Sequence, residues 1–424
     1  MEILKSQNIS FKILFLSVSI AVYLGLFIFQ DGLRFSPIWD EPHYWETSLL
    51  FSNNLIPDIK SLKNYGELNT PLPFILFGIL EYLFKGGIFA GRFLNLIISF
   101  FITCTIGLSQ PGNHKKSLLA VIGLLLCPYY LWLSSHLYTD IIATFFVLLG
   151  FILYIRTLNI LSGIAFILAI ASRQYMLVFP VSLLAFELFN VLKSKVNISL
   201  TESQGKAKNS IFSTRLLMPL IASLSILGWF LFFNGIAPQS GLAQSPTPEV
   251  QQSLFAVAPD SSLYFLACVG LYFVIPELCL FHTRSLFHLN IPIRKLLTLK
   301  NCLLALALLI LFAIFPPLQT HGILTNVAEK LPNDFLKLTL YYVLALVAAL
   351  RFSRVDIAFW ILFVNCALMM KAFPWDKYVL PLIVVFWYLK SINYLHLETL
   401  PNLSFKTQDK GQMVKIKNKK KIYF

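Results

Sequence analysis

The stretch FKILFLSVSIAVYLGLFIFQ, residues 11–30, decides the fold class. It carries no charge after Lys12. As a helix it is long enough to cross the apolar core of a bilayer, which needs about 20 residues. No small-residue cleavage pattern follows it, so we interpret the run as a retained membrane anchor and not as a signal peptide.

The composition extends this interpretation to the whole chain. Of the 424 residues, 57% are hydrophobic and only 13% are charged, which is not typical of a soluble globular protein. We therefore expect an all-α polytopic membrane protein, a bundle of about twelve transmembrane helices. The expected spans are residues 11–30, 88–108, 117–134, 140–156, 158–171, 174–192, 215–234, 261–281, 301–315, 335–350, 355–370 and 378–395.

The basic residues predict the orientation. The net charge is +14, but the Lys and Arg residues gather in short loops between apolar runs, which is the signature of membrane orientation and argues against nucleic acid as a partner. A cytoplasmic N-terminus places Lys115 and Lys116, the 193–214 loop and the lysine-rich tail on one side of the membrane. The six cysteines lie in or beside apolar runs without metal-ligand spacing, so we expect neither a disulfide framework nor a zinc site.

This orientation divides the chain into four parts. Residues 1–192 form an N-terminal module with a first external loop at 31–87, and 193–214 form a basic cytoplasmic loop. Residues 215–395 form a second transmembrane module, and 396–424 form a basic cytoplasmic tail. The apolar run at 71–84 is too short for a span, and counting it as one would move Lys115 outside. We predict that it is an amphipathic helix on the outer membrane surface.

The sequence Ile38-Trp-Asp-Glu-Pro-His-Tyr-Trp45 follows the first span at the outer mouth. Asp40 and Glu41 lie side by side among aromatic residues, a pattern that favours a polar site where a carboxylate acts as a base. Trp39 and His43 are candidates for the mouth of this site. The alternative is a helix N-terminus, with Asp40 as N-cap and proline in the first turn.

Two more polar positions fall on the same face. Asp140 begins a later span two residues after Tyr138, where it serves either a site or the helix cap. Arg173, followed by Gln174, lies in a tight outer hairpin with no acid nearby in the sequence. An arginine there is costly unless a partner satisfies it, and its planar fork suits a phosphate. The alternative is snorkelling toward lipid headgroups.

A fourth stretch, Phe373–Pro381, brings a second cation, Lys377, and Tyr378 to the same outer mouth. Two acids and two cations on one face beside lipid indicate an enzyme that handles a phosphate-bearing lipid. A transporter would instead place polar groups in the middle of its spans and show paired broken helices.

Together these stretches resemble the GT-C superfamily, membrane glycosyltransferases that use polyprenyl-phosphate sugars. The resemblance rests on the acidic pair after the first span, on Thr70-Pro71 before the surface helix and on the acid that opens a later span. Leu137–Asp140 and Ser172–Gln174 look most like the dolichyl-phosphate-glucose α-1,2-glucosyltransferases, whose matching stretches read Tyr-Tyr-Thr-Asp and Arg-Gln-Thr-Asn. The resemblance covers about 11–192 and only patches beyond. Ala237–Gly241 stands where that family has a Gly-Asp-Lys…His cluster, so the sugar and the acceptor stay open.

The resemblance implies a GT-C-like bundle in a bacterial plasma membrane or endoplasmic reticulum, with 1–192 as the catalytic module. A polyprenyl-phosphate-linked hexose would pass, with inversion, to a hydroxyl of a glycan, lipid or protein acceptor at the extracytoplasmic or lumenal face. Asp40 would be the base and Glu41 a weaker candidate, while Asp140 would orient the acceptor or hold Arg173. The expected donor-phosphate residues are Arg173, Lys377, Gln174 and Tyr378, and those of the acceptor mouth are His43, Tyr138 and Trp39.

Two other functional classes stay open at this level. A flippase or transporter of a lipid-linked saccharide would show the same basic and aromatic mouth but would not need Asp40. A structural subunit would tolerate the loss of all four polar positions. No cofactor is expected, and the sequence leaves a divalent metal open.

Overall fold

The computed structural model describes residues 2–110, 114–200, 214–244, 250, 256–281 and 298–395. Within these ranges all regular structure is helical, and His321 and Trp375 form only an isolated bridge. The predicted all-α class is confirmed. The expected tail at 396–424 and most of the 193–214 loop lie outside the described residues.

The N-terminal half contains most of the helices that carry candidate residues. They are α1 (Glu2–Phe29), η1 (Asp31–Leu33), α2 (Glu41–Leu50), α3 (Ile59–Lys63), α4 (Leu72–Phe84), α5 (Ile88–Gly107), α6 (His114–Leu125), α7 (Pro128–Ser134), α8 (Thr139–Ile155), α9 (Asn159–Ser172), η2 (Gln174–Leu177) and α10 (Val178–Leu200). Helix α10 continues into the predicted 193–214 loop, so the first part of that segment is helical and not loop.

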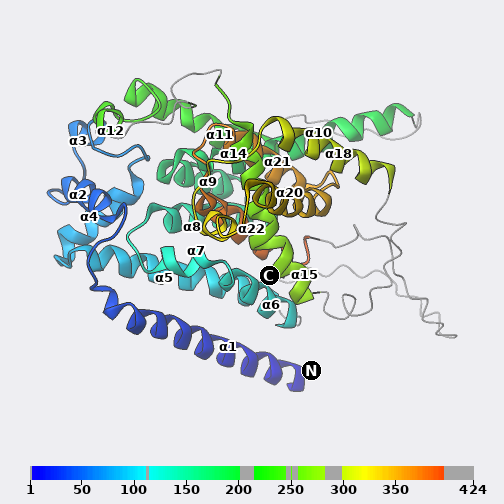
Figure 1. Ribbon diagram of the computed structural model, residues 1–424. Helices are drawn as coiled ribbons and strands as arrows, with labels where there is room; N and C mark the ends of the chain where they lie inside the picture. The colour runs from blue at the N-terminus through cyan, green and yellow to red at the C-terminus, as the bar shows by residue number, and fades with distance from the viewer. Residues whose placement is uncertain are drawn as a thin grey trace.

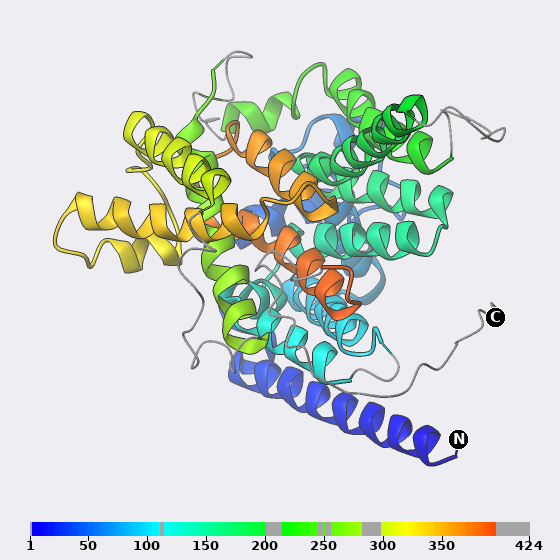
Figure 2. The same cartoon turned by 90° about the vertical axis from the view of Figure 1, so that its right-hand side faces the viewer.

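The C-terminal half adds the remaining described helices of the bundle, including the one at its centre. They are α11 (Thr214–Phe233), α12 (Gln239–Gln244), α14 (Pro259–Val269), the π-helical η3 (Gly270–Val274), α15 (Ile275–Phe281), α18 (Leu299–Ile314), α19 (Ile323–Ala328), α20 (Asp334–Arg351), α21 (Ile357–Met369), η4 (Asp376–Val379) and α22 (Leu380–Ser391). Every residue of α22 is buried, and the helix lies in the middle of the bundle in Figure 2.

Among the described residues, five helices are long and apolar enough to cross a membrane. They are Ile9–Phe29, Ile88–Gly107, Gln174–Lys193, Thr214–Phe233 and Pro259–Phe281. The pair α6 and α7 makes a sixth if the two are one broken span. The twelve expected spans therefore exceed what helix length and composition support. The runs at 140–156, 158–171, 301–315 and 355–370 do form helices, but these are shorter apolar helices.

The expected span at 117–134 is bent by 76° between α6 and α7. Proline at position 128 explains the break. It has no N–H to continue the hydrogen-bond ladder of α6, and it forces the preceding residue out of helical geometry. Cys127 is accordingly extended, with φ −76° and ψ 111°. The bend leads the chain into the segment at 135–138, which approaches Asp40.

The segment that follows α1, residues 31–87, packs together at one end of the molecule. In Figure 1, α2, α3, α4 and α12 lie together at the end away from the N-terminus. Helix α4 is the helix predicted at 71–84, and it packs beneath α2. The two come so close at Gly78 that a Cβ there would lie 2.8 Å from the backbone carbon of Phe51. Because Phe51 is the C-cap residue of α2, this contact fixes the C-terminal end of α2 against α4.

Candidate functional site

Asp40 occupies the N-cap position of α2, but its side chain makes no capping hydrogen bond. The alternative interpretation of Asp40 as a simple helix cap therefore loses its main physical support. The side chain is 39% exposed. The preceding residue, Trp39, has a φ of 56°, an uncommon conformation for a bulky side chain. Backbone strain of this kind occurs most often at functional sites.

Lys377 approaches Asp40 from the other end of the chain. Its Nζ donates to Oδ2 of Asp40 at 3.3 Å, and its side chain is only 3% exposed. The ammonium also lies 3.6 Å from the centre of the Trp375 ring, a cation–π contact. Burial lowers the pKa of Lys377, and nearby Asp140 and Asp40 oppose that effect. Among the described residues, Oδ1 of Asp40 makes no hydrogen bond, so that oxygen is available to a ligand.

Glu41 is enclosed, although it is the sequence neighbour of Asp40. Its fully buried carboxylate forms a two-pronged ion pair with Arg92, with Nε–Oε1 at 2.9 Å and Nη2–Oε2 at 2.6 Å. The N–H groups of Leu137 and Ile38 donate to the same two oxygens. The remaining amino group of Arg92 donates to the carbonyls of two residues in the 33–35 segment.

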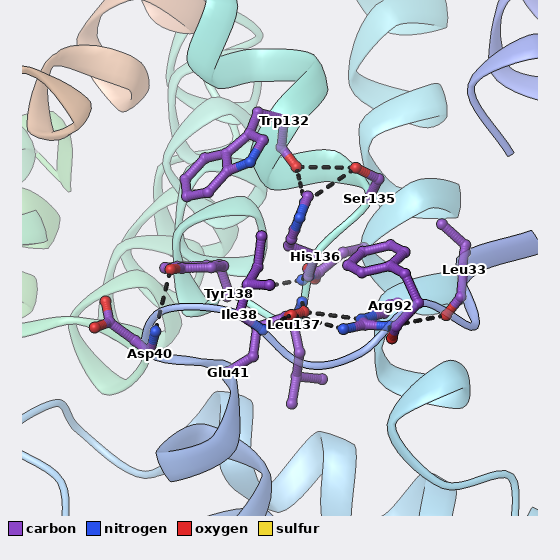
Figure 3. Close-up of polar contacts among 12 residues, drawn as sticks. Leu33, Ile38, Asp40, Glu41, Arg92, Trp132, Ser135, His136, Leu137 and Tyr138 are labelled. Atoms are coloured by element: carbon purple, nitrogen blue, oxygen red, sulfur yellow. Dashed lines mark hydrogen bonds and ion pairs between the residues drawn. The ribbon is translucent and has the colours of Figure 1, made fainter. Parts of the chain in front are cut away.

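The expectation that Glu41 is a weaker candidate for the catalytic base does not fit this geometry. Both of its oxygens accept two hydrogen bonds, and the side chain has no exposure to take a proton from a substrate. Figure 3 shows the Asp40 carboxylate pointing away from the Glu41–Arg92 pair. We therefore assign Glu41 a structural role: it ties the start of α2 to α5 and to the segment before α8.

The Tyr138 side chain contacts the backbone of Asp40. Its hydroxyl accepts from the N–H of Asp40 at 3.4 Å, and its side chain is fully buried (Figure 3). Asn95 holds this segment by donating to the carbonyls of His136 and Tyr138 at 2.7 and 2.8 Å. Tyr138 was expected at the acceptor mouth, but its side chain is fully buried and contacts the backbone of Asp40.

Arg173 and Asp140 form a buried ion pair through Nη1 and Oδ2. The same amino group donates to the hydroxyl of Thr139 at 3.1 Å, and Tyr175 donates to the other Asp140 oxygen at 3.2 Å. Arg173 is 5% exposed, which does not fit the snorkelling alternative. Of the two roles considered for Asp140, the geometry fits holding Arg173.

Two cavities adjoin at Arg173. The polar cavity, about 320 Å³ in volume, is lined by side chains that include Asp40, His43, Glu46, Glu67, Gln244 and Lys377. The apolar cavity, about 430 Å³, is lined by side chains that include Leu177, Ile226, Phe230, Ile236, Leu368 and Phe373. Leu68, Asn69, Arg173 and Tyr378 line both. Among the described residues, the buried Nε of Arg173 has no hydrogen-bond partner. An unsatisfied buried donor at this junction points to a ligand that supplies an acceptor.

Of the other predicted site residues, Gln174 and His43 each line one cavity and Trp39 lines neither. Gln174 lines the apolar cavity, and its amide donates to the carbonyl of Leu68 at 2.6 Å, so it positions a loop and is not free for a phosphate. His43 is exposed and lines the polar cavity. Trp39 is 70% exposed and lines neither cavity.

Glu67 is a half-buried acid at this site that the sequence motifs did not single out. It lines the polar cavity, and burial raises its pKa to about 7, with a further contribution from the charge of Asp40. Among the described residues its carboxylate has no hydrogen-bond or ion-pair partner. Nothing in its sequence context distinguished it from the other acids of the external loop.

The buried carboxylate of Asp376 fixes η4. It accepts hydrogen bonds from the hydroxyls of Tyr129 and Tyr272 and from the N–H of Leu324. Gly322 makes room for it: a Cβ there would lie 1.7 Å from Oδ1 of Asp376. This network holds the backbone next to Lys377, and so sets the direction from which the ammonium reaches Asp40.

The fold and the site together define an all-helical protein whose long apolar helices indicate a membrane location, with a polar and an apolar cavity meeting at a buried arginine. No three His, Cys, Asp or Glu side chains gather closely enough to hold a metal ion within the described ranges. Comparison of the chain with protein-family models, with curated proteins and with solved structures finds no match.

Proposed function

We propose that the chain is a membrane glycosyltransferase of GT-C type, which moves a hexose from a polyprenyl-phosphate donor to an acceptor hydroxyl. The reaction takes place at the extracytoplasmic or lumenal face, with inversion of the anomeric carbon. The proposal includes the twelve-span topology, in which neighbouring helices shield the ends of the shorter apolar helices.

The observation that carries the proposal is the meeting of the two cavities at Arg173. A lipid-linked sugar phosphate has three chemically different parts: an apolar chain, an anion and a polyhydroxyl ring. The apolar cavity suits the chain, Arg173 with its unsatisfied Nε suits the anion, and the polar cavity suits the ring. Such an order of apolar surface and a few convergent polar groups is typical of ligand sites.

The mechanism follows from the position of Asp40. Its carboxylate removes the proton from the acceptor hydroxyl while that oxygen attacks the anomeric carbon, and the bond from that carbon to the phosphate oxygen breaks on the opposite side. The polyprenyl phosphate leaves with its electron pair. Arg173 and Lys377 stabilise the charge that grows on the phosphate. Asp140 and Glu41 act through others, since each holds an arginine.

The test is a transfer assay in proteoliposomes with a polyprenyl-phosphate donor of known anomeric configuration. NMR of the product should show a new glycosidic bond of opposite configuration. A lipid-linked saccharide that crosses the bilayer without forming that bond would instead favour the flippase alternative. A retained configuration would contradict the single-displacement mechanism.

A further inference from the structure

The charges around the polar cavity are unevenly distributed. Both cations are already engaged, because Arg173 pairs with Asp140 and Lys377 contacts Asp40. Two more carboxylates, Glu46 and Glu67, line the same cavity. Because both cations are already paired, the rest of the described lining offers an incoming acceptor carboxylates and no further lysine or arginine.

Glu67 is held in place and not left to move away. Tyr65 donates to the carbonyl of Asn69 at 2.6 Å, and Thr70 donates to the carbonyl of Ile170 at 2.7 Å. Helix α12 closes over the same loop, so that a Cβ at Gly241 would lie 2.6 Å from the carbonyl oxygen of Glu67. The loop on which Glu67 stands is therefore tied down on both sides.

The remaining lining suits hydroxyl groups. An ionised carboxylate accepts hydrogen bonds but cannot donate one, while amides do both. Glu67, Asn69 and Gln244 together can satisfy several hydroxyls of one sugar ring. An acceptor bearing a carboxylate or phosphate would meet like charge in a partly desolvated site, and like-charge juxtaposition is an effective way to reject a wrong partner.

We propose that the part of the polar cavity lined by Glu67, Asn69 and Gln244, next to the part that the donor ring occupies in the proposed reaction, binds the hydroxyls of an uncharged acceptor sugar. Glu67 excludes acceptors that carry an anion. This inference rests on the proposed transfer reaction, because only that reaction makes the bound sugar an acceptor. Its test is a binding measurement that needs no donor and no turnover.

The test measures the binding of matched 4-nitrophenyl glycosides to the protein in nanodiscs by saturation-transfer NMR. The measurement is made at pH 8, above the pKa of about 7 for Glu67, so that this side chain is mostly ionised. The neutral glucoside, galactoside and mannoside are compared with the corresponding uronides, which differ only by a carboxylate in place of the CH₂OH group. We expect at least one neutral glycoside to bind at least about tenfold more tightly than its uronide. Glu67→Gln should narrow that ratio several-fold, because the amide removes the charge and keeps the shape.

Asp58→Asn is the matched control. Asp58 lies in the same external segment but outside both cavities, and it caps α3 by accepting from the N–H of Ser61, which asparagine does equally well. It should leave the ratio unchanged. Equal or tighter binding of uronides, binding of no neutral glycoside, or an unchanged ratio in Glu67→Gln would each overturn the inference. None of these results would contradict the transfer proposal, which is tested separately by the transfer assay.

Discussion

Lys377 and Asp40 lie at opposite ends of the chain, yet Nζ of Lys377 is 3.3 Å from Oδ2 of Asp40. The contact brings the segment at 31–87 to η4, which leads into the central helix α22. The candidate site is therefore built from both halves of the molecule, and a fragment ending near residue 192 would lack one of its two cations.

Arg173 should govern donor binding. Arg173→Ala is expected to weaken binding of a polyprenyl-phosphate sugar and to slow transfer by at least about 10²-fold, since it removes the charge beside the leaving phosphate. Arg173→Lys keeps the ion pair with Asp140 but cannot form a two-pronged contact, so it should rescue only part of the loss. Equilibrium binding of labelled donor checks this. Unchanged donor affinity in Arg173→Ala would remove the phosphate assignment.

The Glu41–Arg92 pair should matter for folding more than for chemistry. Arg92→Met leaves a buried carboxylate without its cation, which costs about 3–5 kcal/mol in comparable buried pairs. The double variant Glu41→Gln with Arg92→Met removes both charges and should recover part of that loss. Thermal unfolding in detergent measures both. If Arg92→Met matched the parent in stability while transfer collapsed, Glu41 would return as a catalytic candidate.

The parts of the fold that depend on local sequence could be predicted, and those that depend on contacts between distant segments could not. Helices at 88–107, 139–155 and 159–172 follow from local apolar runs, and their bounds were predicted to within a residue or two. The bend after α6 has a local cause too, Pro128. The number of spans is different, because a short apolar helix crosses a membrane only if its neighbours shield its ends.

The candidate site also has residues that were predicted from the sequence and residues that were not. Asp40, Arg173 and Lys377 were predicted on one face from loop charge, and the structure brings them to one polar cavity. The role of Glu41 was not predictable, since its partner Arg92 lies 51 residues away and no motif links them. Glu67 was missed because only the packing of its loop against α12 makes it differ from other external acids.

Selection against anionic acceptors should depend on pH. The pKa of Glu67 is raised to about 7, so the side chain is mostly protonated and neutral below that value and charged above it. Uronide binding should therefore improve about one pH unit below 7 and weaken about one unit above it. Besides Glu67, the charged or titratable side chains in the described lining of the cavity are Asp40, His43, Tyr44, Glu46, Arg173, Lys377 and Tyr378.

Two variants, compared by the same NMR measurement, show which side chain causes the pH dependence of uronide binding. Glu67→Gln should flatten the pH dependence. His43→Gln should leave most of it, and it serves as the control because His43 lines the same cavity. A pH dependence that survives in Glu67→Gln and disappears in His43→Gln would assign the effect to the histidine.

The proposed topology makes a simple prediction about accessibility. Ile56 is 81% exposed in the first external segment, and Lys115 is exposed at the start of α6. In sealed right-side-out vesicles an impermeant thiol reagent should label Ile56→Cys and spare Lys115→Cys, each compared with the parent chain. Labelling of Lys115→Cys from outside would make α4 a span and reverse the orientation of everything after it.

Asp40→Asn separates an enzyme from the other classes most directly. The amide keeps the shape of the side chain but cannot take a proton, and asparagine suits an N-cap position as well as aspartate does. Donor binding and expression should stay close to those of the parent, while transfer of labelled hexose from a polyprenyl-phosphate donor in proteoliposomes should fall by at least about 10²-fold. Transfer at the parent rate would contradict the account, because the carboxylate at the centre of the site would then have no part in the chemistry.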